Sequence, residues 1–317
     1  MRIGYFLSSE ECNPHQLVEQ AALAEKAGFE GLWISDHYHP WNDAQGQSPF
    51  VWGTIGAISQ VCRLPVTTAV TAPIVRIHPA VVAQAAATAA VQLSGHFRLG
   101  VGTGEALNEH IFGDAWPVES VRLEMLEEAI ELIRQLWNGE FTYYHGKHYT
   151  VDHARIYSRP EQPPPIYVSA FGDKSFDLAL RVGDGFMTTS PDAERAREWR
   201  AKAGPDRPTQ AGYKVCVADD EEEGVRIAHR LWATSGLPGE LSQVLPSPRH
   251  FEQASQLVTE EMTRQATTCG KAIDAHVEAF RPYAEAGFDE VYISNIGPHY
   301  RDFFELYADE ILPRLRR

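Results

Sequence analysis

The sequence predicts an α/β protein whose parallel strands close into a (β/α)8 TIM barrel with loop insertions at the mouth. Short apolar runs alternate with helical segments along all 317 residues, eight strand candidates can be counted, and no break in composition divides the chain. Repeated β-α units form parallel sheets, and eight of them favour closure into a barrel. We therefore expect a single domain over residues 1–317, with insertions at about 139–158 and 234–258.

The first unit has clear boundaries. Arg2–Leu7 is a strand candidate, and Asn13 followed by Pro14 is a typical start of a helix, with a capping side chain and proline at the first helical position. The helical period then runs to Gly28, a glycine in the position that often ends a helix. The apolar run GLWIS, residues 31–35, follows as the second strand.

The later units follow the same pattern. Further strand candidates are Val66–Thr71, Phe97–Gly102, Ile166–Ala170, Gly185–Thr188, Gly212–Val217 and Glu290–Ser294. Helices are expected at Pro79–Val91, Val118–Trp137, Lys174–Val182, Ala193–Ala203, Glu221–Trp232, Ala272–Ala286 and Arg301–Leu315. An open doubly wound sheet is the alternative, but nothing near the first strand resembles the GxGxxG that a dinucleotide-binding sheet carries.

Two segments do not fit the repeat and are predicted to be insertions. Phe141–Val151 has the pattern of a hairpin that turns at His145-Gly146, and Ser235–Arg249 is rich in Gly, Pro and Ser, as a loop is. Insertions in barrels usually lie at the mouth, where they help to close a site.

The composition excludes several partners. The net charge is -15, which disfavours nucleic acids and anionic membranes because both would repel the chain. The four cysteines form no CxxC pair, so neither zinc nor a disulfide framework is indicated. No signal peptide is visible, and no run approaches the ~18 apolar residues of a membrane helix. We expect a cytoplasmic protein that acts on a small molecule.

Reactive side chains follow three strand candidates directly, at the end of the barrel where active sites lie. Ser35–Trp41 contains His37, which can act as a general base, and Trp41, whose indole ring can form a flat wall of a site. Gly102–Glu109 combines two glycines, which allow close approach of a ligand, with Glu105. Ser169–Ser175 precedes a helix whose free N–H groups can bind phosphate without lysines. Each cluster also has a purely structural interpretation, as a plug or an ordinary βα turn capped by Asp173.

The HxH formed by His37 and His39 has the spacing of a metal site in barrel hydrolases. Such a site would need further histidines or carboxylates at later strand ends, and the fifth, sixth and seventh strand ends have no histidine. We therefore expect no metal.

These motifs, taken in order, carry a resemblance to a known family. SDHYHPW, TAVTAP, GVGTGEALNE, LIRQLWNGE and RVGDGFMTTS resemble the F420-dependent branch of the bacterial luciferase-like superfamily, and within it the F420-dependent glucose-6-phosphate dehydrogenases. The resemblance runs nearly end to end. It implies a (β/α)8 barrel, often a homodimer, with coenzyme F420 in the mouth and a non-proline cis peptide near Ala69-Val70.

The resemblance also implies residue roles. His37 would exchange the substrate hydroxyl proton, Glu105 would serve the deazaflavin ring nitrogen, Trp41 would stabilise the reacting substrate, and Glu10 aligns with an active-site carboxylate. The implied cofactor contacts are Asp36, Ala69, Val70, Thr103, Gly104 and Asn108, with Phe171, Gly172, Lys174 and Ser175 at the phosphate tail. Phe171 stands where the family usually has a glycine.

One part of the family pattern is missing. The cations that hold the sugar phosphate match Asp192, Ala266 and roughly Ser242, and none of these is basic, although Arg249 and Arg264 lie near two of them. We therefore expect a neutral alcohol or unphosphorylated sugar as substrate. The alternatives are an FMN-dependent oxidoreductase or monooxygenase of the same superfamily, a sugar-6-phosphate dehydrogenase with a rearranged phosphate site, and a non-catalytic cofactor-binding relative.

Overall fold

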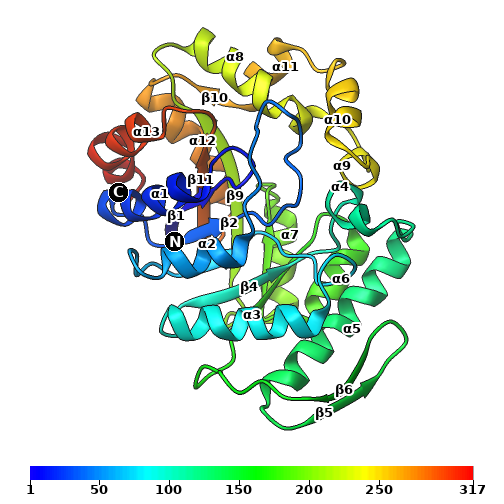
Figure 1. The fold of residues 1–317 in the computed structure, drawn as a ribbon. Helices are drawn as coiled ribbons and strands as arrows, with labels where there is room; N and C mark the ends of the chain where they lie inside the picture. The colour runs from blue at the N-terminus through cyan, green and yellow to red at the C-terminus, as the bar shows by residue number, and fades with distance from the viewer. Residues whose placement is uncertain (317) are drawn as a thin grey trace.

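The chain forms a closed barrel of eight parallel strands in the computed structural model, which describes residues 1–316 (Figure 1). The strands are β1 (Arg2–Leu7), β2 (Leu32–Ile34), β3 (Val66–Thr68), β4 (Phe97–Val101), β7 (Ile166–Ser169), β8 (Gly185–Thr188), β9 (Thr209–Cys216) and β11 (Glu290–Asn295). They are hydrogen-bonded in the order β9-β11-β1-β2-β3-β4-β7-β8, and the pairing of β8 with β9 closes the ring. The predicted fold class is confirmed.

The first β-α-β unit shows why the sequence marks its boundaries so clearly. The Asn13 side chain accepts a hydrogen bond from Gln16 N, and the Gln16 side chain accepts one from Asn13 N, so both capping groups are used at the start of α1 (Pro14–Ala27). Gly28 ends this helix at φ 93°, in the left-handed region that favours glycine. The chain then enters β2, which pairs in parallel with β1.

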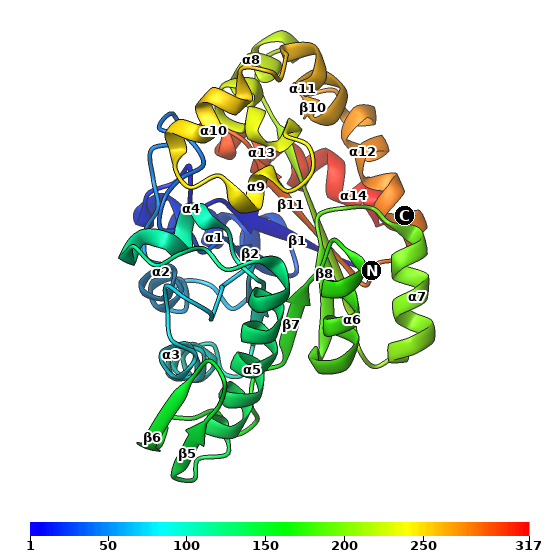
Figure 2. The same ribbon diagram turned by 90° about the vertical axis from the view of Figure 1, so that its right-hand side faces the viewer.

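The helices surround the barrel (Figure 2). Those predicted from the sequence are α1, α3 (Pro79–Gln92), α5 (Glu119–Trp137), α6 (Asp173–Val182), α7 (Ala193–Ala203), α8 (Glu221–Trp232), α12 (Ile273–Ala286) and the C-terminal segment α13 (Tyr300–Leu306), a π-helical turn (Tyr307–Ile311) and α14 (Leu312–Leu315). Two short elements, α2 (Val51–Ile58) and α4 (Ala106–Glu109), were not predicted. The alanines of α3 are buried, which lets this helix pack closely.

Side chains fill the inside of the barrel. The rings of Trp33 and Tyr292 stack at a centroid distance of 4.7 Å, and Phe6 packs edge-on against Trp33 at 5.5 Å. Tyr167 and Met187 complete this layer. Because the interior is packed, a ligand site can form only above this layer, at the ends of the strands.

The first insertion is a hairpin, as predicted, made of β5 (Thr142–His145) and β6 (Thr150–Ala154). It lies far from α8 in both ribbon views (Figures 1 and 2) and packs along α5, where the Glu128 carboxylate accepts hydrogen bonds from His148 N and Tyr149 N. The hairpin follows the end of α5, and none of its residues lines the catalytic cavity described below. Both insertions were expected at the mouth of the barrel, but this hairpin lies on its side, beside α5.

The second insertion lies at the mouth but is not a simple loop. It contains a 3-10 turn (Ala233–Gly236), α9 (Leu241–Val244) and α10 (Pro248–Ser255), and is followed by α11 (Glu260–Ala266) and the short strand β10 (Thr268–Cys269). Pro248 is placed at the start of α10, and Phe251 is buried beneath it. The high Gly, Pro and Ser content therefore marks turns between short helices, and the prediction of a loop over Ser235–Arg249 is corrected.

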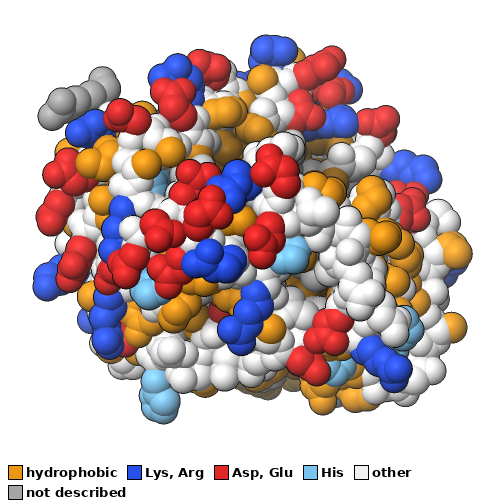
Figure 3. Space-filling view, turned by 90° about the horizontal axis from the view of Figure 1, so that it is seen from above, with side chains coloured by type: hydrophobic (Ala, Val, Ile, Leu, Met, Phe, Trp, Pro, Cys, Tyr) orange, Lys and Arg blue, Asp and Glu red, His pale blue; other side chains and the backbone are white. Residues whose placement is uncertain are grey.

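The surface carries mixed charges. In the face shown in Figure 3, acidic and basic side chains are interspersed and hydrophobic atoms appear in small groups between them. Within residues 1–316, no helix combines the length and the apolar character needed to cross a membrane.

Candidate active site

A cavity of about 520 Å³ opens at the carboxyl ends of the barrel strands. The loops after β1, β2, β3, β4, β7 and β8 all contribute to its wall, and so do β9 and the second insertion. Its floor includes Phe6, Trp33 and Met187 of the packed barrel interior. Of the predicted site residues, the cavity is lined by Glu10, His37, Trp41, Ala69, Val70, Thr103, Gly104, Glu105, Phe171, Gly172 and Ser175.

His37 and Glu10 face each other inside this cavity. His37 follows β2, and its Nε2 lies 3.4 Å from Oε1 of Glu10, which follows β1. Only 8% of His37 and 3% of Glu10 is exposed. Glu10 also accepts hydrogen bonds from the hydroxyls of Ser8 (3.0 Å) and Ser35 (2.7 Å). Burial opposes ionisation of Glu10, but His37, the Ser35 hydrogen bond and Lys214 outweigh it, so the pKa of this carboxyl is lowered.

Asn108 connects the other side of His37 to Glu105. The Asn108 Oδ1 accepts hydrogen bonds from the backbone N–H groups of Tyr38 (2.9 Å) and His39 (3.1 Å), which fixes the orientation of its amide. Its Nδ2 then lies 3.1 Å from His37 Nδ1 and donates to Glu105 Oε2 at 3.2 Å. The loop after β2 and the turn after β4 are therefore held together by one side chain.

Aromatic rings enclose the space beside His37. The Trp41 ring lies 5.0 Å from the His37 ring and packs edge-on against Phe251 of α10 at 5.1 Å. Trp232, at the end of α8, lines the same cavity. Rings on two sides exclude water from the position where a substrate carbon would sit.

The opposite wall is shaped for a flat ring. The peptide bond Ala69-Val70 is cis, as the family resemblance implies. A Cβ at Gly102 would come within 2.8 Å of the Val70 side chain, and Gly104 has φ 67°. Gly102 lets the turn after β4 approach Val70 without a side chain between them, and Gly104 lets the same turn approach Ala72, so no side chain projects from the wall at these two positions.

A helix N-terminus borders the cavity at α6. Gly172, not Asp173, is the capping residue, and the Ser175 hydroxyl bonds to the Gly172 backbone. The first N–H groups of a helix have no acceptor within it and can bind a phosphate. The Phe171 side chain is 61% exposed at this rim. Lys174 does not line the cavity, but its Nζ lies 2.7 Å from the carboxylate of Glu119, which does.

Three predicted cofactor contacts, Asp36, Asn108 and Lys174, do not line the cavity. Asp36 lies behind the wall and is 4% exposed. Its carboxylate is 2.8 Å from Arg76 Nη2 and accepts a hydrogen bond from Thr71 Oγ1 at 2.7 Å. Asp36 thus joins the end of β2 to the loop after β3, and Asn108 joins two loops in the same way, so both support the wall from behind.

The structure adds two residues that were not predicted, Lys214 on β9 and Trp232. Lys214 is the one charged residue of the buried strand β9, and this signal is visible in the sequence. Trp232 ends a helix more than 190 positions after Trp41, and only the closed barrel brings the two to one cavity.

Together, the fold and the cavity define an enzyme-type (β/α)8 barrel, with an imidazole, an indole and two carboxyl groups gathered at the catalytic end of the strands. Residues 1–290 match the family described as luciferase-like monooxygenase, and the chain belongs to this family.

Similar proteins extend the comparison over the whole chain. An F420-dependent glucose-6-phosphate dehydrogenase from Nakamurella multipartita is 36% identical over 331 aligned positions, covering 100% of this chain and 97% of that protein. A protein of the same description from Microbacterium testaceum is also 36% identical, with 100% and 98% covered. Among solved structures, an F420-dependent secondary alcohol dehydrogenase in complex with an F420-acetone adduct has a TM-score of 0.91 and 29% identity, with 100% and 99% covered.

Proposed function

We propose that this chain is an F420-dependent oxidoreductase that transfers a hydride between the deazaflavin and a neutral alcohol or unphosphorylated sugar. The observation that carries the proposal is the convergence of Glu10, His37, Trp41 and Glu105 on one cavity whose opposite wall is formed by the cis Ala69-Val70 peptide. Full-length similarity to F420-dependent dehydrogenases supports the choice of cofactor.

In this proposal His37 accepts the hydroxyl proton of an alcohol, and Glu10 stabilises the charge that His37 then carries. In the tautomer whose Nδ1 proton is directed at the His39 carbonyl, 3.2 Å away, His37 has Nε2 free to act as the base, and the Asn108 amide then lies beside the ring without donating to it. The imidazolium formed there would lie 3.4 Å from Glu10, whose lowered pKa keeps it ionised. A buried carboxylate at this distance stabilises the positive charge and so favours proton transfer.

The remaining groups fit a deazaflavin. When bound, F420 supplies the hydride acceptor. Ala69 and Val70 would support its ring, Glu105 would lie near the ring nitrogen, and the N–H groups of α6 with the Ser175 hydroxyl would hold the phosphate of its tail. Asp36, Asn108 and Lys174 were predicted to contact the cofactor directly. They do not line the cavity, so in this proposal they position the residues to which they are bonded.

The positions that match the family's phosphate cations offer no free cation. Asp192 caps α7 by accepting a hydrogen bond from Arg195 N. Arg264 is held by the carboxylates of Glu221 (2.7 Å) and Glu222 (2.8 Å). Arg249, the other nearby arginine, does not line the cavity. A phosphate dianion would therefore find no unpaired arginine at these positions, which supports an unphosphorylated substrate.

Cofactor binding followed by a substrate panel tests the proposal. The purified protein is titrated with F420 and with FMN, and reduction of the preferred cofactor is then followed with propan-2-ol, D-glucose and D-glucose 6-phosphate. We expect tight binding of F420 and turnover of an uncharged substrate. Oxygen consumption with FMN would support the monooxygenase alternative, and saturation by micromolar D-glucose 6-phosphate would show that the phosphate site is rearranged. We also propose that the protein is a cytoplasmic homodimer, which sedimentation of the purified protein tests.

A further inference from the structure

The barrel wall has an opening beside the catalytic cavity. Strand β9 pairs with β11 along one edge, over Gln210–Val215. Along its other edge it pairs with β8 only at residues 209–211 and with β10 only at residues 215 and 216. Gly212, Tyr213 and Lys214 lie between these two pairings and have no strand beside them on that edge.

A second cavity, of about 930 Å³, lies on the far side of this opening. It is lined by Gly212, Tyr213 and Lys214 and by β10 and α12. Five residues line both cavities: Phe6, Thr189, Lys214, Trp232 and Ser235. These shared side chains form the boundary between the second cavity and the space beside His37, so a ligand that passes between them would occupy both.

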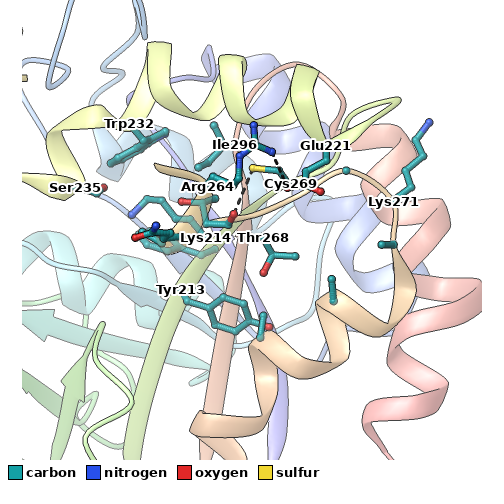
Figure 4. Close-up of a pocket in the computed structure, with 18 of the residues that line it drawn as sticks. Tyr213, Lys214, Glu221, Trp232, Ser235, Arg264, Thr268, Cys269, Lys271 and Ile296 are labelled. Atoms are coloured by element: carbon teal, nitrogen blue, oxygen red, sulfur yellow. Dashed lines mark hydrogen bonds and ion pairs between the residues drawn. The ribbon is translucent and has the colours of Figure 1, made fainter. Parts of the chain in front are cut away.

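Lys214 lies at the junction of the two cavities with its charge unpaired. Its Nζ lies 4.1 Å from the centre of the Trp232 ring and 5.5 Å from that of Phe6, and it forms no hydrogen bond or ion pair with residues 1–316. Figure 4 shows the side chain between Trp232 and Tyr213. Burial lowers its pKa, while Glu10 and Glu11 act in the opposite direction. An ammonium group in this setting needs oxygen atoms for its three N–H donors.

The second cavity is polar, but its other cations are already neutralised. Arg264 is paired with Glu221 and Glu222, and Lys271 is paired with Asp219 (2.9 Å) and Asp302 (3.1 Å). The polar lining also includes hydroxyl and amide groups, among them Thr267, Thr268, Gln265 and the Tyr213 hydroxyl, a buried atom without a hydrogen-bond partner, and the carboxylate of Asp220, which caps α8. This chemistry suits hydroxyl groups, whereas an anion would meet the carboxylates of Glu10 in the first cavity and of Asp220 in the second.

We propose that Lys214 is a specificity-determining residue that donates hydrogen bonds to the hydroxyl oxygens of a polyol or sugar reaching from His37 through the barrel wall into the second cavity. This inference rests on the proposed function and narrows its substrate class from alcohols in general to hydroxyl-rich molecules. A short alcohol would reach His37 but would not contact Lys214 or enter the second cavity, which water would then fill.

The test compares D-sorbitol with propan-2-ol in the F420-loaded enzyme. Lys214→Met removes the donors and keeps most of the side-chain volume. Losing hydrogen bonds from a charged donor should raise the KM for D-sorbitol at least about tenfold more than the KM for propan-2-ol, with a smaller change in kcat. Ala279→Phe, on α12, fills the second cavity without touching Lys214 and should shift the ratio in the same direction. Lys202→Met, on the outer surface of α7, is the matched control and should change neither KM.

A second measurement separates this inference from the proposed function. Calorimetry records binding of D-sorbitol and D-glucose to the wild-type protein and to Lys214→Met, and it needs no turnover. If no alcohol reduces F420 but D-sorbitol or D-glucose still binds in a Lys214-dependent way, the proposed reaction fails and the binding site stands. Equal KM changes for both alcohols in Lys214→Met, or no binding of either polyhydroxy probe by the wild-type protein, would overturn the inference.

Discussion

At the scale of single residues, Asn108 joins two groups that come from different loops. Its Nδ2 lies 3.1 Å from His37 Nδ1 and 3.2 Å from Glu105 Oε2. Neither group could be placed relative to the other from the sequence, because the distance between them is set by the closure of the barrel. Their roles can be separated by removing each proton-transfer group in turn.

His37→Ala and Glu105→Gln should each reduce kcat by at least ~100-fold, the usual effect of removing a proton-transfer group. The measurement is steady-state reduction of F420 with the best alcohol from the panel. His145→Ala, at the exposed tip of the hairpin, is the control and should retain wild-type rates. If either active-site variant keeps the wild-type rate, its assigned role is wrong.

Asn108→Asp should shift the pH dependence of kcat/KM. The aspartate still accepts from Tyr38 N and His39 N, but it places a carboxylate oxygen where Nδ2 stood, beside His37 and Glu105. The added negative charge favours the protonated histidine, so the base becomes available only at higher pH. We expect the rising limb of the profile to move up by about one pH unit. Asn138→Asp, an exposed residue after α5, introduces the same charge and should not move it.

The residues predicted from the sequence are mostly those that directly follow a strand. His37, Trp41 and Glu105 could be found because a short motif and the barrel pattern together place them at the catalytic end. Asp36 and Asn108 lie in the same motifs but point behind the wall, and sequence spacing does not reveal which way a loop side chain turns. Lys214 was not predicted because it lies within β9, whereas the predicted residues follow the ends of strands.

At the scale of elements, the turn from β4 to α4 depends on one glycine. Gly104 has φ 67°, and a Cβ there would lie 2.9 Å from Ala72 Cβ and 2.9 Å from Glu109 Cγ. Gly104→Ala should push the turn away from the loop after β3 and raise the Kd for F420 at least about tenfold, since misplaced contacts of this kind cost 1 kcal/mol or more.

Gly113→Ala is the matched control for this substitution. Gly113 has φ 87° but open space around its Cβ position, so the control carries the left-handed strain without the contacts. Cofactor titration of both variants therefore isolates the effect of crowding. If both variants bind F420 equally well, the turn after β4 does not shape the cofactor site.

The elements that the sequence predicted well are the long ones with marked ends. For α1, the sequence contains the capping residue, the first proline and the final glycine, and all three are used. The short helices α2, α4, α9, α10 and α11 were missed because four to eight residues carry little periodicity. The strand β10 has two residues, and its pairing with β9 is a tertiary effect that no local pattern predicts.

At the scale of the whole molecule, Glu11 ties together parts of the chain that lie far apart in sequence. Its carboxylate accepts hydrogen bonds from Trp232 Nε1, at the end of α8, and from Gly297 N, after β11. Burial raises its pKa from 4.5 to about 7, although both hydrogen bonds act in the opposite direction. The folded protein therefore holds this proton more tightly than the unfolded chain does.

The sign of the resulting pH dependence follows from this difference. Between pH 4.5 and about 7 the folded state binds more protons at Glu11 than the unfolded state, so this group lowers the free energy of unfolding as the pH rises through that range. The upper limit of the effect is about 3 kcal/mol, at 1.36 kcal/mol per pKa unit. In Glu11→Gln the contribution is absent, because the amide does not titrate.

Urea denaturation from pH 5 to pH 8 gives the free energy of unfolding of the wild-type protein and of Glu11→Gln. The difference between the two free energies measures the contribution of Glu11 directly. The variant is less stable at pH 5, because its NH2 group faces a backbone or indole N–H where the carboxyl group had an acceptor oxygen. The difference should shrink steadily as the pH rises, while Glu285→Gln, on the exposed side of α12, should follow the wild-type curve. A difference that stays constant with pH would mean that Glu11 is ionised throughout, so that its two hydrogen bonds outweigh its burial.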